Sequence, residues 1–177
     1  MTRTLVLIDI DGVLVPMRHR KVVPAPDEVN HQIAIPPLVP RSVDIRPLAI
    51  EAVNRWAASG ADVQWLTSWG WRSKWLDQAG LPELPVFYDP DPYEVYGWGR
   101  SQRSWKKPAV EQFLESQSEP IRLAWVDDDA FFFRAAEARV QLLARHACLS
   151  DLLLVETDGY IGLTDAEIRR IDRFLAT

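Results

Sequence analysis

Short apolar runs that end at once in polar, mostly acidic residues are the feature of this sequence that most constrains its fold. The runs cover residues 5–8, 63–66, 121–126 and 152–155 and are interrupted only by Gln64 and Arg122. Asp9, Thr67 and Asp127 follow the first three. Continuous apolar runs of this length are typical of strands buried on both faces of a parallel sheet. The carboxyl ends of such strands meet at one edge, so these polar residues are expected to converge on one crevice.

Helical patterns separate the apolar runs. Apolar residues recur there at helical spacing, and several starts carry a proline or a capping residue. The predicted helices cover residues 47–59, 71–78, 108–117, 130–144 and 164–175. In the last of these, Thr164 and Glu167 have the spacing of a capping box. Strands that alternate with helices predict a doubly wound α/β fold with a parallel, Rossmann-like sheet.

The size and composition of the chain indicate one domain. A chain of 177 residues with 47% hydrophobic and 25% charged residues is long enough to bury a single core. We therefore expect one domain over residues 1–177, with an insertion at residues 15–46. Residues 15–47 hold seven of the 13 prolines, which excludes a long helix and predicts a loop or a ragged hairpin.

Charge and cysteine content exclude several classes of protein. The formal charge of −5 argues against overall electrostatic binding to nucleic acid or a membrane, although a local basic patch remains possible. Cys148 is the single cysteine, so an internal disulfide and a zinc site built from paired cysteines are excluded. No apolar run reaches the ~18 residues of a membrane span, and the first run is too short for a signal peptide. We expect a cytoplasmic protein with no membrane partner.

The acidic strand ends predict a metal site. Asp9 and Asp11 follow the first strand, and Asp127 and Asp128 follow the third. Carboxylates that converge in one crevice repel one another unless a cation lies among them. A site of carboxylate, carbonyl and water oxygens suits Mg²⁺. The sequence therefore predicts Mg²⁺ as the cofactor.

A lysine pair completes the predicted site. Lys106 and Lys107 directly precede Pro108, the predicted start of a helix. A lysine at that place can neutralise a phosphate held by the metal. Together with the carboxylates and the hydroxyl of Thr67, it supplies what phosphoryl transfer through a carboxylate nucleophile requires.

These residues resemble the haloacid dehalogenase-like (HAD) hydrolases in all four sequence motifs of that family and in their order. The matching segments are Asp9-Ile10-Asp11-Gly12-Val13-Leu14, Trp65-Leu66-Thr67, Lys107-Pro108 and Val126-Asp127-Asp128. The resemblance covers nearly the whole chain and implies a HAD core. Gly162-Leu163-Thr164 before the last helix is also similar to small bacterial members that include the phosphatase-like domains of RNA-repair proteins.

The resemblance implies a role for each motif residue. Asp9 attacks the phosphorus and becomes an aspartyl phosphate, and Asp11 protonates the leaving oxygen and then activates water. Thr67 and Lys107 hold the transferring phosphoryl oxygens. Lys107 is favoured over Lys106 because the proline after it fixes the helix start, as in the family motif. Ser68 competes with Thr67 for its role, since Thr67 also has the features of a helix cap.

The resemblance also implies the metal ligands and the way the site is covered. Asp9, the backbone carbonyl of Asp11, and Asp128 are expected to hold Mg²⁺. Asp127 is expected to be a further ligand or to contact one. Family members often carry a large cap domain, but residues 15–46 are short and rich in proline, which predicts a flap and an open site.

Basic and aromatic residues near the motifs bear on the substrate. We expect substrate contacts from Ser68, Trp69, Arg100, Arg103, Trp105 and Lys106. Cations interleaved with aromatic rings suit phosphate contact and base stacking, and an open site admits a macromolecular end. The predicted substrate is a nucleotide or a phosphorylated nucleic-acid end. The alternative is a small metabolite such as a sugar phosphate, if several tryptophans near the motifs instead belong to the core. These tryptophans are Trp69, Trp71, Trp75, Trp98 and Trp105.

A third hypothesis is of another class: a binding module that kept the fold and lost turnover. A phosphorylation-receiver domain also combines Asp, Thr and Lys at strand ends. The order of the motifs argues against it, because its second acidic site precedes the hydroxyl residue, whereas Asp127 and Asp128 follow Thr67 here. The sequence does not indicate an oligomeric state.

Overall fold

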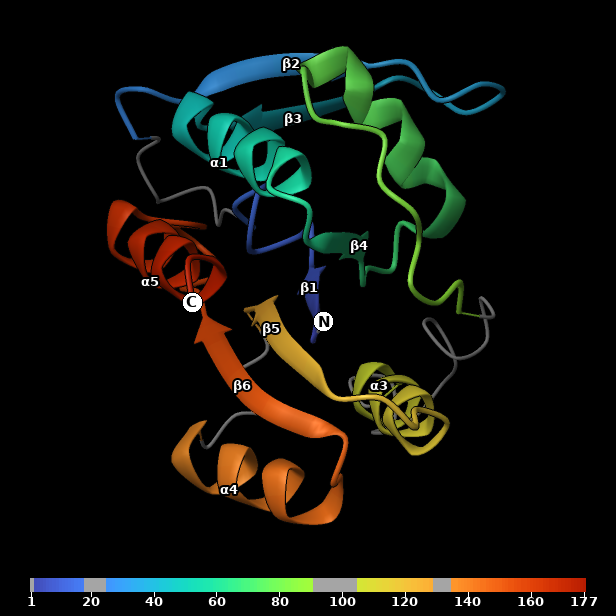
Figure 1. Cartoon of the computed structure of the whole chain (residues 1–177). Helices are drawn as coiled ribbons and strands as arrows, with labels where there is room; N and C mark the ends of the chain where they lie inside the picture. The colour runs from blue at the N-terminus through green and yellow to red at the C-terminus, as the bar shows by residue number, and fades with distance from the viewer. Residues whose placement is uncertain (1, 18–24, 91–104, 129–134) are drawn as a thin grey trace.

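The centre of the molecule is a parallel four-stranded sheet with strand order β4-β1-β5-β6 (Figure 1). The structure is a computed structural model that describes residues 2–17, 25–90, 105–128 and 135–177. The strands are β1 (Arg3–Ile8), β4 (Asp62–Trp65), β5 (Ile121–Asp127) and β6 (Leu149–Glu156). Each of the four predicted strands is present. The α/β fold class is confirmed.

Helices cover both faces of this sheet, as the alternation of side chains along β1 requires. Val6 and Ile8 are fully buried in the core that includes residues of α1 (Pro47–Ala58) and α5 (Asp165–Leu175). Leu5 and Leu7 are equally buried in the core shared with α3 (Lys106–Glu115) and α4 (Ala135–Arg145). Residues 5–8 of the central strand are therefore apolar on both faces, and the polar residues that follow them stand at its carboxyl end, where the site lies.

Sequence signals explain most of the helix boundaries. Pro47 occupies the first turn of α1, and Glu167 accepts the backbone N–H of Thr164 at 2.7 Å in the predicted capping box of α5. The start of α3 was predicted at Pro108 but lies at Lys106. A proline is tolerated throughout a first turn because the N–H groups there lack an intrahelical acceptor.

The inserted segment forms a flap that is a two-stranded antiparallel hairpin. Its strands are β2 (Val29–Ile33) and β3 (Arg41–Ile45). Ile33, Val43 and Ile45 are buried in the same core as α1, so the hairpin is packed against the domain. Figure 1 shows it beside α1 and η1 (Gly70–Ala79), a 3₁₀ helix where the sequence predicted a helix over 71–78. Between β1 and α1, the described residues contain no large cap domain.

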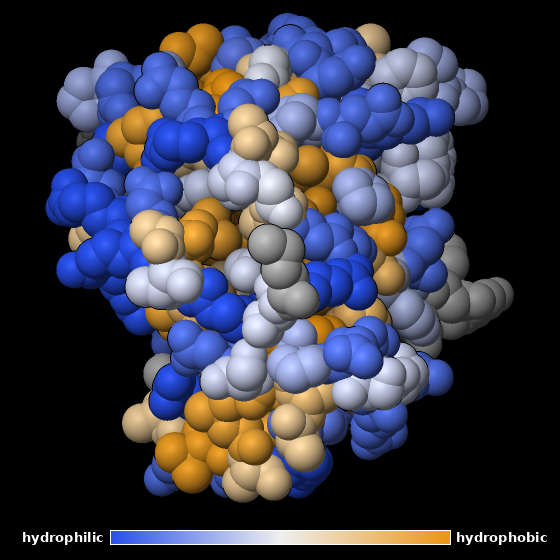
Figure 2. Space-filling model, viewed as in Figure 1, coloured by the Kyte–Doolittle hydropathy of each residue, from blue (hydrophilic) through white to orange (hydrophobic). Residues whose placement is uncertain are grey.

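The surface of the described residues adds two observations. Hydrophobic side chains gather over α4 at the lower end of the view in Figure 2, where Ala136 and Val140 help to line a shallow pocket of about 300 Å³. The described part of α4 begins at Ala135, within the predicted 130–144 helix. Across the described ranges, no helix combines the length and the apolar character that crossing a bilayer requires.

Candidate active site

Asp9 is held at the end of β1 by its backbone and by two contacts of its carboxylate. Its N–H donates to the carbonyl of Val126 in the neighbouring strand at 3.0 Å. Oδ1 accepts the N–H of Ile10 at 2.7 Å, and Oδ2 lies 2.5 Å from Nζ of Lys106. The residue is only 6% exposed. Asp9 therefore has a fixed orientation and is shielded from water.

Lys106 joins the two strand ends that were predicted to converge. Its Nζ lies 2.7 Å from Oδ2 of Asp127 as well as 2.5 Å from Asp9. Asp127 is 1% exposed, and its Oδ2 also accepts the indole N–H of Trp125 at 3.2 Å. The ammonium group thus bridges β1 and β5 inside the protein, where Coulomb attraction is screened less than at the surface.

Burial dominates the electrostatics of this pair. Burial raises the pKa of the Asp9 carboxyl to about 7, and the nearby Lys106 ammonium limits that rise. Burial lowers the pKa of Lys106, but Asp9 and Asp127 together outweigh that effect and keep it above the usual lysine value. The lysine therefore stays charged, and Asp9 is sensitive to any further cation brought near it.

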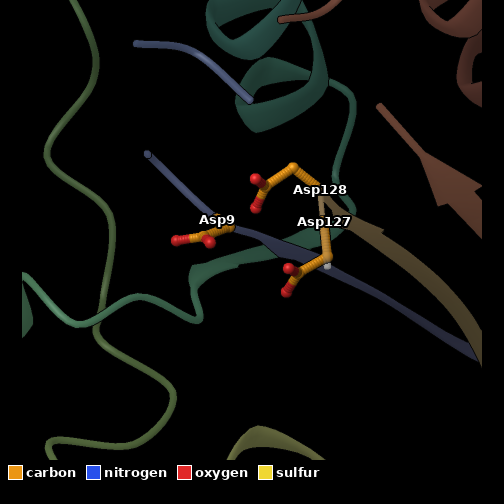
Figure 3. A group of neighbouring side chains, drawn as sticks. All are labelled: Asp9, Asp127 and Asp128. Atoms are coloured by element: carbon orange, nitrogen blue, oxygen red, sulfur yellow. The ribbon is translucent and has the colours of Figure 1, made fainter. Parts of the chain in front are cut away.

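A third carboxylate completes a group that could hold a metal ion. Oxygen atoms of Asp9, Asp127 and Asp128 all lie within 4.8 Å of one another. Figure 3 shows the three side chains at the adjoining ends of β1 and β5. With all three ionised, the carboxylates and the Lys106 ammonium leave a formal charge of −2. This charge and the all-oxygen donor set fit a hard divalent cation.

Two glycines leave the room that Asp128 occupies. Gly12 has a φ of +75°, which favours glycine, and a Cβ there would stand 2.2 Å from Oδ2 of Asp128. A Cβ on Gly159, in the loop after β6, would stand 2.5 Å from the same oxygen. The hydroxyl of Thr157 donates to the carbonyl of Gly12 at 2.9 Å and ties the two loops together. Asp128 is thus enclosed by close backbone contact.

Asp11 lies on the other side of the strand end and has different partners. The indole N–H of Trp69 donates to its Oδ2 at 3.0 Å. Arg41, on strand β3 of the flap, places Nη2 3.7 Å from Oδ1. The same guanidinium lies over the Trp69 ring, 4.5 Å from its centroid. Asp11 is therefore the point at which the flap meets the strand ends.

Thr67 lies directly after β4, next to β1 in the sheet. It is fully buried, and its hydroxyl accepts the backbone N–H of Trp69 at 3.3 Å, as a capping residue does. Ser68, its competitor for the same role, is half-buried. The N–H of Leu66 donates to the carbonyl of Ile8 at 2.9 Å, which keeps this strand end in register with β1.

The structure differs from the sequence analysis in the lysine that reaches the carboxylates. The ammonium group that contacts them belongs to Lys106, whereas the sequence analysis favoured Lys107. Both residues lie in the first turn of α3, where neighbouring residues point about 100° apart. Because Lys106 projects into the cluster, Lys107 points away from it. Lys107 is half-buried outside these contacts.

Two of the residues predicted to contact substrate, Trp69 and Trp105, are packed against other parts of the protein. Trp69 is 3% exposed and contacts Asp11 and Arg41. Trp105 stacks on Tyr88 with centroids 5.8 Å apart and packs against the core beneath α3. Arg100 and Arg103 lie outside the described residues, as does Trp98.

Sequence reasoning missed three contributors to the site. Thr157 and Gly159 come just after the fourth predicted strand, as the other site residues come just after the first three strands. Their position at a strand end could have predicted that they belong to the site. Arg41 had no such signal, because its place depends on how a proline-rich segment pairs into a hairpin.

Comparison with protein families assigns most of the chain to a family. Residues 5–168 match the model of a family described as the HAD domain in Swiss Army Knife RNA repair proteins. The matched range includes every motif described above. A comparison with curated proteins found no match.

Proposed function

Because the chain belongs to the family of HAD domains found in Swiss Army Knife RNA repair proteins, we propose that it is a Mg²⁺-dependent phosphohydrolase with Asp9 as its nucleophile. The observation that carries this proposal is the buried contact between Asp9, Lys106 and Asp127. A carboxylate is a weak nucleophile toward a phosphate dianion unless cations offset both charges. Lys106 supplies one such cation inside the cluster.

Asp9 then forms a covalent bond to phosphorus while the bond from phosphorus to the leaving oxygen breaks. An aspartyl phosphate results, and water hydrolyses it to inorganic phosphate and free carboxylate. Asp11 gives its proton to the leaving oxygen and afterwards takes one from the attacking water. Its half-buried side chain, 27% exposed, supports this role, because the group must exchange protons with substrate and water.

The transferring phosphoryl oxygens need donors fixed before the reaction begins. We assign these donors to Thr67, which is buried at the end of β4, and to Lys106. Lys106 replaces Lys107 in this role because its Nζ lies between the two buried carboxylates. Ser68 is the second candidate for the hydroxyl.

Asp9, Asp127 and Asp128 would hold the cation, together with the backbone carbonyl of Asp11. When bound, Mg²⁺ would offset negative charge on phosphate and carboxylates as a Lewis acid. The matching formal charge and the oxygen-only donors support this metal over zinc, which prefers nitrogen and sulfur ligands.

Trp69 and Trp105 pack in the core, which favours the alternative of a small metabolite such as a sugar phosphate. From the flap and from a different ring, we propose instead a nucleotide or a phosphorylated nucleic-acid end as the substrate. The flap leaves room that a large cap would fill, which favours a macromolecular end. On η1, the 45% exposed ring of Trp71 lies 5.5 Å from the Arg72 guanidinium and 5.6 Å from the Lys74 ammonium. An exposed ring beside two cations suits a stacked base with flanking phosphates.

A phosphatase screen tests the function directly. The purified chain is assayed for phosphate release from an aryl phosphate, sugar phosphates, nucleotides and phosphorylated oligonucleotides, with Mg²⁺ and with excess chelator. We expect Mg²⁺-dependent release, with oligonucleotide ends preferred over sugar phosphates. Activity that survives the chelator would refute the metal assignment, and a preference for sugar phosphates would refute the substrate. Binding without turnover of any ester would favour an inactive module.

A further inference from the structure

The flap reaches the proposed site through Arg41. The guanidinium lies between two groups of the core: the Trp69 ring, 4.5 Å from its centroid, and Oδ1 of Asp11, 3.7 Å from Nη2. The Trp69 ring is itself fixed, since it is 3% exposed and its N–H donates to Asp11 at 3.0 Å. The long Arg41 side chain thus packs its guanidinium against the fixed Trp69 ring at the edge of the site.

The contact with Asp11 is too weak to explain this placement by itself. At 3.7 Å it is an ion pair without a hydrogen bond, and 53% of the Arg41 side chain is exposed. Such half-solvated pairs contribute little to stability. The planar guanidinium carries five N–H donors in a fork that fits phosphate oxygens. Arg41 therefore presents donors to solvent beside the carboxylate that serves the leaving oxygen.

We propose that Arg41 determines specificity by binding an anionic group on the leaving alcohol, such as the next phosphate of a nucleotide or oligonucleotide. This proposal rests on the proposed function, in which Asp11 protonates the leaving oxygen. A cation in contact with Asp11 is close to whatever that oxygen is attached to. The reacting phosphoryl group is served by Lys106, which lies on the Asp9 side of the strand end.

The test compares substrates that differ by one phosphate. Values of kcat/KM are measured for a nucleoside 3′,5′-bisphosphate, the matching 5′-monophosphate and an aryl phosphate with an uncharged leaving group. The enzymes are the wild-type chain, Arg41→Gln, Arg41→Lys and Arg55→Gln. Arg55 is the matched control, because its side chain is also 53% exposed in an ion pair, but with Asp172 of α5.

We expect Arg41→Gln to lower kcat/KM for the bisphosphate about tenfold more than for the aryl phosphate, the size of one lost charge-assisted contact. Arg41→Lys keeps the charge without the fork and should fall between. Arg55→Gln should leave the ratio of the two substrates unchanged. If Arg41→Gln lowers all three substrates equally, Arg41 only orients Asp11 and the proposal is wrong.

Failure of the proposed function gives a different result: the wild-type chain hydrolyses none of the esters, the aryl phosphate included. Binding then decides the proposal, with the affinities of the bisphosphate and the monophosphate measured by titration calorimetry. Weaker binding of the bisphosphate alone to Arg41→Gln, by about fivefold or more, supports an anion subsite at Arg41. Equal affinities for wild type and variant overturn it.

Discussion

Asp9 and Asp11 are two residues apart at one strand end, yet they lie in opposite surroundings. Asp9 is 6% exposed and lies with Lys106 among groups from β5 and α3. The side chain of Asp11 is 27% exposed and contacts Trp69 and the flap residue Arg41. We call these two regions the buried side and the flap side.

The difference indicates how one strand end can serve two tasks. On the buried side, little water competes with the ionic contacts, so charge is balanced at short range and the geometry is fixed. On the flap side, contacts are longer and partly solvated, so they can be exchanged for contacts with a ligand. We expect substitutions on the buried side to change the rate of the chemical step. Substitutions on the flap side should change substrate preference and proton transfer.

The largest effect is expected for Asp9→Asn, which removes the proposed nucleophile. Phosphate release should fall by at least about 10³-fold, as it does when a covalent nucleophile is lost. The measurement is turnover of an aryl phosphate by protein purified free of other phosphatases. Retention of more than a few per cent of the wild-type rate would reduce Asp9 to a turn residue.

The same substitution should stabilise the metal-free protein, and the gain should depend on pH. The pKa of Asp9 is raised from 3.8 to about 7, so the folded state holds this proton more tightly than the unfolded state. Wild-type stability therefore falls as pH rises from about 4 to about 7, whereas the amide variant does not titrate. In excess chelator, the Tm difference between Asp9→Asn and wild type should be larger at pH 8 than at pH 5. A pH-independent difference would contradict it.

The next largest effect separates the two neighbouring lysines. Lys106→Met should lower kcat by about 10²- to 10³-fold, the range for one lost transition-state donor. Lys107→Met is the matched control, because Lys107 is the next residue of α3. This substitution should change kcat little. Because Lys106→Met also leaves buried carboxylates without their cation, the Tm of both variants is measured with and without Mg²⁺. Equal loss of kcat in both variants would refute the assignment.

The lysine pair also marks where sequence reasoning ends. The strand ends at Asp9, Thr67 and Asp127 were predictable, because buried parallel strands read as apolar runs and their polar ends must meet. The choice between Lys106 and Lys107 depends on how the first turn of α3 is oriented against the strand ends, and no local sequence pattern records that orientation. In the structure, Lys106 faces the cluster.

The flap side was harder to predict for a different reason. Its contacts join residues far apart in sequence, such as Arg41 with Asp11 and with Trp69, and no local period records them. The tryptophans show the same limit, because rings interleaved with basic residues fit either core packing or a substrate surface. Trp56, Trp65 and Trp125 are almost completely buried, whereas Trp71 is exposed. Only the three-dimensional packing distinguishes these two groups.

A smaller effect on the buried side tests the close packing around Asp128. Gly159→Ala places a methyl group 2.5 Å from Oδ2 of Asp128, which is closer than van der Waals contact allows. The displaced carboxylate should weaken Mg²⁺ activation by about tenfold or more, as other changes next to a ligand do. The measurement is the Mg²⁺ concentration at half-maximal rate. Gly60→Ala is the control for stability, because its Cβ would meet nothing within 4 Å, although its φ of +86° adds strain. An unchanged Mg²⁺ requirement in Gly159→Ala would remove Asp128 from the ligand set.

The smallest effect is expected on the flap side, for Trp69→Phe. The ring stays beneath Arg41, but the N–H that donates to Oδ2 of Asp11 at 3.0 Å is lost. A carboxylate without this donor is less well oriented, so kcat for an aryl phosphate should fall about tenfold or less. Trp71→Phe, on the exposed face of η1, is the control and should leave kcat unchanged. If both Trp69→Phe and Trp71→Phe keep the wild-type kcat, the hydrogen bond to Asp11 does not orient it for proton transfer, and the functional contrast between the two regions then rests on Arg41 alone.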